Sequence, residues 1–148
     1  MNDMEKNVFE WVAFIFLFIW QLPQNILGLC FLLYFKLVKS LELVDKTKWS
    51  YAFKSKYMTG GISLGTFCFL SRLSAERKED VAHELVGHTF DSRLMGPLYL
   101  IIIGLPSILN AMFDFTECYF DFYPEKRANN NAGLEVDEHC RLKFKEEQ

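Results

Sequence analysis

The sequence predicts a mainly α-helical integral membrane protein: one membrane-embedded domain over residues 1–148, with two apolar helical segments and a small β-hairpin. Two stretches, residues 11–35 and 94–113, contain no charged side chain. A chain of 148 residues leaves too little other sequence to bury both stretches in a soluble core. Each stretch is expected either to cross a bilayer or to break and re-enter, and the lipid bilayer is the first expected partner.

The first apolar segment, residues 11–35, is long enough to span a membrane. As a helix it reaches about 37 Å, against a hydrocarbon thickness of roughly 30 Å. Acidic residues precede it and no small-residue cleavage site follows, so it is not expected to be a signal peptide. Pro23, between Gln21 and Asn25, predicts either a kink or two half-helices that meet at a turn. The amide side chains there are expected to pack against protein rather than lipid.

The second apolar segment, residues 94–113, has the length of one crossing, but its punctuation favours a broken element. It contains Gly96, Pro97, Gly104 and Pro106, which are typical of breaks and turns. Crossing and re-entry therefore both stay open for this segment.

The polar remainder predicts three smaller elements. Residues 49–70 are expected to form a β-hairpin with its turn near residues 59–61, and a polar helix follows over residues 75–92 with Ser74 as its N-cap. The charged tail, residues 134–148, is expected to be frayed or to form a short surface helix.

The cysteines and the charges exclude some classes of function. The four cysteines, at 30, 68, 118 and 140, have no CxxC spacing and are expected to be reduced and unpaired. No basic run alternates with aromatic residues, so nucleic acid is not an expected partner.

The residues that could carry chemistry lie in the polar helix, which reads His-Glu-Leu-Val-Gly-His over residues 83–88. The zinc motif H-E-x-x-H needs two histidines four residues apart on one helical face. Here the histidines are five apart, about 140° around a regular α-helix. In that register Glu84 and His88 share a face and Leu85 replaces the catalytic glutamate. A one-residue bulge would instead put His83 beside His88 and leave Glu84 as the base.

Six stretches of the chain resemble a family of small, uncharacterised bacterial membrane proteins with a His-Glu-x-Gly-His motif. The matching stretches are residues 20–28, 61–65, 87–92, 96–100, 103–107 and 123–129. That motif is similar to the motif of gluzincin-type zinc metallopeptidases, whose third ligand is a glutamate in an E-x-x-A-D/N setting, and residues 125–129 are similar to it. The resemblance implies a bacterial inner-membrane protein that binds zinc through His83, His88 and Glu125, with Glu84 as the catalytic residue.

Two functions are therefore expected. The first is a membrane-anchored, zinc-metallopeptidase-like hydrolase that acts on a protein substrate, or a catalytically impaired relative if the helix is regular. The alternative is a non-catalytic membrane scaffold or binding subunit, in which the amides of residues 21–25 pack against partner helices.

The zinc site and the membrane topology depend on each other. If the second segment crossed completely, His88 and Glu125 would lie on opposite faces of the bilayer, so a shared ion requires it to turn back, best at residues 104–107. Residues 36–93 carry ten Lys/Arg, against one before the first segment and five after the second. This bias predicts a cytoplasmic location for residues 36–93 if both segments span.

Overall fold

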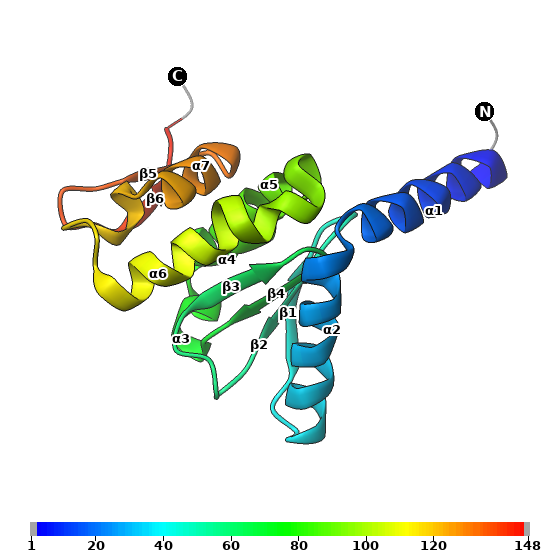
Figure 1. The fold of residues 1–148 in the computed structure, drawn as a ribbon, viewed down its shortest axis with the longest axis horizontal. Coiled ribbons are helices and arrows are strands. Elements are labelled where there is room, and N and C mark those ends of the chain that lie inside the picture. Colours follow the sequence, from blue (N-terminus) through cyan, green and yellow to red (C-terminus); the bar gives the residue numbers. More distant parts are fainter. Residues whose placement is uncertain (1–2, 147–148) are drawn as a thin grey trace.

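The computed structural model describes residues 3–146, which form a mainly helical chain around a small sheet (Figure 1). The sheet has the order β1-β2-β4-β3. Its strands are β1 (Glu42–Lys46), β2 (Tyr51–Lys54), β3 (Gly61–Leu64) and β4 (Phe67–Leu70). The helices before and after it are α1 (Asp3–Trp20), α2 (Leu22–Leu37), α3 (Arg72–Glu76), α4 (Lys78–Ala82), α5 (Thr89–Met95), α6 (Leu105–Phe113) and α7 (Tyr123–Asn131).

Helices cover both faces of the sheet. On one face, Phe35 of α2 packs with Leu64 and Phe69. On the other face, Val81 of α4 and Leu85 pack with a group of small and apolar sheet residues that includes Cys68. The helix that carries the candidate motif is therefore fixed on a sheet whose opposite face is held by α2.

The predicted hairpin over residues 49–70 is wrong in its pairing. Strands β2 and β4 run parallel, and the hairpin is formed by β3 and β4. Its turn is at Gly65, whose φ of +69° lies in the left-handed region that favours glycine. The sequence contains an earlier glycine pair at residues 60–61, and that pair is not the hairpin turn. The pairing leaves β3 at the edge of the sheet.

The predicted polar helix over residues 75–92 exists in broken form. It begins earlier than expected, because Ser71 and not Ser74 is the N-cap, and the Ser71 Oγ accepts a hydrogen bond from the Ser74 N–H. The helix breaks at Arg77, whose backbone is extended, and continues from Lys78. Between α4 and α5 lies one wide π-helical turn, η1 (His83–His88).

Both apolar segments are bent. None of the helices in residues 3–146 is by itself long and apolar enough to cross a membrane. Two bent pairs reach that length and composition only together: residues 4–37, which turn by 93° at residue 21, and residues 78–113, which turn by 120° at residue 99. The second segment therefore does turn back, but at residue 99, directly after the short helix η2 (Gly96–Leu98), and not at residues 104–107. Its chain continues through a second π-helical turn, η3 (Leu100–Gly104), into α6.

The amide cluster is buried against protein, as expected. Gln21, Gln24 and Asn25 are at most 2% exposed. Gln24 Nε2 donates to Ser92 Oγ at 3.0 Å, and Ser92 Oγ donates to Gln21 Oε1 at 2.7 Å. Asn25 Oδ1 accepts from the Thr66 N–H at 2.7 Å. These contacts join the bend between α1 and α2 to α5 and to the sheet.

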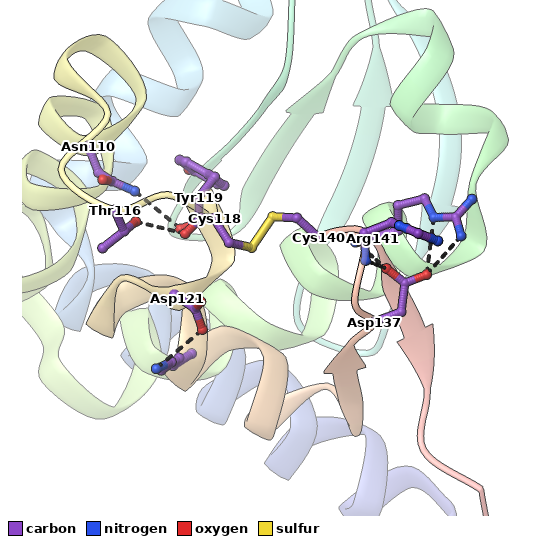
Figure 2. The surroundings of a disulfide bond; sticks show 10 residues. Asn110, Thr116, Cys118, Tyr119, Asp121, Asp137, Cys140 and Arg141 are labelled. Carbon is purple, nitrogen blue, oxygen red and sulfur yellow. Dashed lines mark hydrogen bonds and ion pairs between the residues drawn. A yellow bond between two sulfur atoms is a disulfide. The ribbon is translucent and has the colours of Figure 1, made fainter.

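The predictions for the tail and for two cysteines are wrong. Strands β5 (Leu134–Val136) and β6 (Leu142–Phe144) pair antiparallel, so the tail is neither frayed nor helical there. Cys118 and Cys140, 22 residues apart in sequence, form a disulfide that joins this ribbon to the segment before α7 (Figure 2). Cys30 and Cys68 are free thiols. The disulfide depends on the chain returning through α7, which no local spacing reveals.

Candidate metal centre

The π-helical turn η1 brings the two histidines of the motif together. In a π-helix the backbone hydrogen bond joins residues five apart, so residues i and i+5 come to the same face. His83 and His88 have this spacing, and their ring centroids are 4.7 Å apart. The structure thus has the bulged register, and the regular-helix alternative is wrong.

Helix α7 supplies the third residue of the predicted site. It packs directly on η1. Gly87 allows this approach, because a Cβ atom there would lie 2.4 Å from the carbonyl oxygen of Ala128. Glu125 lies in the first turn of α7, after Pro124, and its side chain is fully buried. Close packing of α7 on η1 therefore points the carboxylate at the histidines.

Glu125 meets both histidines through one oxygen atom. Its Oε2 lies 2.9 Å from His83 Nε2 and 3.2 Å from His88 Nε2. The Glu125 Oε1 accepts a hydrogen bond of 2.5 Å from Ser107 Oγ at the start of α6. The expected approach of His88 to Glu125 is thus found, and it follows from the turn of the second apolar segment.

Asn129 orients the first histidine from behind. Its Oδ1 lies 2.7 Å from His83 Nδ1 and can only accept, so the proton of a neutral ring sits on Nδ1. The lone pair of the ring is then on Nε2, the atom that faces Glu125. The sequence offered a sign of this residue, because Asn129 lies four positions after Glu125 and so on the same face of α7. The contact of Ser107 had no such sign.

Glu84 lies beside the histidines but turns to the sheet. Its Oε2 accepts a hydrogen bond of 2.6 Å from Ser63 Oγ on the edge strand β3. Possible ligand atoms of His83, Glu84 and His88 all lie within 4.8 Å of one another, and the three residues are buried. This buried group could hold a metal ion.

The charges at the centre favour a cation between these groups. Burial lowers the pKa of His88, but the hydrogen bond that its ring donates to Glu125 and the negative charges nearby outweigh burial and raise the pKa to about 9. Burial likewise raises the pKa of Glu125, but its contacts with both histidines hold it well below its usual range. A carboxylate that faces two imidazole nitrogens needs a positive charge there, which a proton or a metal ion can supply.

Two carboxylates lie close to these histidines. Glu84 belongs to the buried group that could hold a metal ion, and Glu125 Oε2 is in contact with both Nε2 atoms. Each carboxylate also accepts a hydrogen bond from a serine. Comparison with protein-family models, with curated proteins and with solved structures finds no match to this chain.

Proposed function

We propose that this chain is a membrane-associated, zinc-dependent hydrolase of the gluzincin kind, with peptidase-like chemistry. The ligands would be His83, His88 and Glu125, and the general base would be Glu84. One observation carries the proposal: a wide helical turn restores the geometry that five-residue spacing would otherwise destroy, and it leaves a carboxylate next to the first histidine.

The donor set fits zinc. Two imidazole nitrogens and one carboxylate oxygen, with an open fourth position, are a known ligand set of catalytic zinc. Donors about 2.1 Å from a tetrahedral ion are about 3.4 Å from one another. The distances of 2.9 and 3.2 Å from Glu125 Oε2 to the two Nε2 atoms need only a few tenths of an ångström of widening. Asn129 supplies the contact to the far ring nitrogen that zinc-binding histidines commonly have.

The residues around the site have separate tasks in such a hydrolysis. A bound zinc ion supplies Lewis acidity, which lowers the pKa of a water molecule towards 7 and polarises a carbonyl group. Glu84 accepts the proton that the attacking water loses and returns it to the leaving nitrogen. Ser63 donates to one oxygen of Glu84, so the other oxygen stays free to accept that proton. Ser107 holds Glu125 in place through the oxygen that does not face the histidines.

The position of β3 supports a peptide as substrate. This strand is at the edge of the sheet, and it contacts the motif helix through Ser63. The Ser63 C=O on this strand accepts a hydrogen bond from the Tyr99 hydroxyl, and an extended peptide would pair with the remaining outward N–H and C=O groups. A substrate paired there would lie along the site.

The surface of the chain supports association with a bilayer. Large apolar side chains of α1 are well exposed, among them Phe9, Trp11 and Phe16 at 65–68%. Ile101 at 68%, with Met112 and Phe113 of α6 at 65% and 62%, adds a second apolar surface. Large exposed apolar surfaces commonly mark sites of contact with a membrane or with another protein. We therefore propose that α1 and α6 contact lipid, and that the protein needs detergent or lipid to stay in solution.

The alternative of a membrane scaffold now has less support. It relied on amides that would reach partner helices, whereas the side chains of Gln24 and Asn25 bond within the chain. The exposed apolar surface of α1 still suits a partner helix as well as it suits lipid.

The test is metal content together with hydrolysis. The purified protein should hold about one zinc ion per chain, and His88→Ala should lose both the metal and the cleavage of a quenched fluorescent peptide. Glu84→Gln should keep the metal and lose the cleavage. His139→Ala is the matched control, because its side chain is 66% exposed and lies outside the site. Equal zinc content in the wild type and in His88→Ala would refute the site.

A further inference from the structure

A cavity of about 370 Å³ lies directly beside the candidate metal centre. Its wall includes Glu84, His88 and Ser107. The rest of the wall comes mainly from apolar side chains of α2, β3, η3 and α6. Its volume is at the lower end of the range for ligand sites, about 300–1,000 Å³. The cavity can therefore hold a few side chains next to the reacting groups.

Three leucine and isoleucine side chains belong to both the cavity and the outer surface. Leu27 of α2 is 43% exposed, Leu105 of α6 is 52% exposed and Ile108 of α6 is 44% exposed, and all three line the cavity. A side chain can do both only at an opening. The mouth of the cavity therefore lies between α2 and α6.

The surface around this mouth is apolar. Ile26 on α2 is 50% exposed, and Met112 on α6 is 65% exposed. In the cavity wall itself, the charged or ionisable side chains are Glu84, His88 and two tyrosines, and Glu84 and His88 belong to the candidate site. A charged substrate chain would lose its hydration in this wall without gaining a partner, whereas an apolar chain loses unfavourable contact with water.

We propose that the site takes an apolar stretch of a membrane-inserted polypeptide, which enters sideways between α2 and α6. This inference rests on the proposed hydrolase function and names its substrate class. The mouth is on the same exposed apolar surface of α6 that contacts lipid in that proposal, so a segment can pass from the bilayer to Glu84 without crossing water. The acyl chain of a lipid ester is the competing ligand, and the edge strand beside the cavity favours the peptide, because only a peptide backbone can pair with it.

The experiment compares two peptides with equal flanks, one with three central leucines and one with three central serines. Both are given to the zinc-loaded full chain in phospholipid vesicles. The leucine peptide should be cleaved with a kcat/KM at least tenfold higher. Ile108→Trp, which fills the mouth, should reduce cleavage of the leucine peptide at least tenfold. Leu33→Trp is the control, since Leu33 of α2 is 58% exposed and lies outside the cavity wall.

A binding measurement separates this inference from the hydrolase proposal. Fluorescence anisotropy with a labelled leucine peptide is measured on Glu84→Gln, with and without Ile108→Trp. Binding that Ile108→Trp weakens tenfold supports the apolar entrance even if no peptide is cleaved. Equal kcat/KM for the two peptides would refute the apolar entrance, and so would binding that neither Ile108→Trp nor Leu105→Trp changes. Either result would leave the proposed zinc site and hydrolase function unaffected. Cleavage of a fluorogenic fatty-acid ester in preference to the leucine peptide overturns the peptide assignment.

Discussion

Replacing Asn129 with alanine should weaken zinc binding without removing a ligand. Asn129 Oδ1 lies 2.7 Å from His83 Nδ1 and fixes the ring so that Nε2 faces Glu125. Loss of such an outer contact commonly lowers metal affinity about 10- to 100-fold. At about 1.4 kcal/mol per tenfold change, this is about 1.4–2.8 kcal/mol. We expect the loss of zinc affinity to fall within this range, because the Asn129 side chain is only 4% exposed and water cannot easily replace it.

The measurement is a zinc titration against a chelating dye of known affinity. Asn130→Ala is the control, since Asn130 is the next residue of α7 but its side chain contacts Lys145 instead of the site. Asn129→Asp should keep or raise the affinity, because a carboxylate accepts the same hydrogen bond more strongly. A loss of less than threefold in Asn129→Ala, or an equal loss in Asn130→Ala, would refute the role of Asn129 in orienting His83.

Four further predictions concern the turn, the disulfide, the amide cluster and the pH dependence. Deletion of Val86 should convert η1 into a regular helical turn with the histidines four residues apart, and the zinc content should stay near one ion per chain. A chain with two alanines inserted after Val86 should bind no zinc. Metal analysis of both purified variants tests this. Replacing Cys118 and Cys140 with serine should lower the unfolding free energy by about 3 kcal/mol, as expected for a loop of this length, and an unchanged urea midpoint would contradict it. Gln24→Leu should destabilise the protein by roughly 1 kcal/mol, because Ser92 then loses a buried partner; thermal unfolding measures it, with Leu22→Ala on the exposed side of the same helix as the control. In the metal-free protein, the unfolding free energy should fall as the pH rises from 6.5 to about 9, because His88 binds its proton more tightly when folded; a flat profile, or the same slope in His88→Gln, would count against this.

The sequence predicted the parts of the fold that follow from local pattern. The two long stretches without charged residues predicted the positions of both apolar segments. Pro23 and the amide residues beside it predicted the bend in the first segment. The histidine spacing already limited the helix to two registers, and only packing could decide between them. Leu85 is buried against the sheet, and Gly87 is packed against α7. The segment must therefore place one residue on the sheet and the other on α7, and the wide turn allows both contacts.

Other features depend on contacts between distant segments. The turn at Gly65 pairs β3 with β4, whereas the parallel pairing of β2 with β4 joins strands that are not consecutive, and a pattern of strand-forming residues does not predict it. The Cys118–Cys140 bond requires the path of α7. The location of residues 36–93 stays a prediction: loop charges favour the cytoplasm, whereas disulfides persist mainly in oxidising compartments.

The disulfide also sets when the site can be completed during synthesis. His83 and His88 are made first, Glu125 follows, and Cys140 is made after all three. Before Cys140 emerges, the loop that carries Glu125 lacks the covalent link that closes it, and only the packing of α7 and the contact with Ser107 hold the carboxylate in place. Chains cut short before Cys140 should therefore hold Glu125 beside the two histidines less firmly than the full chain does.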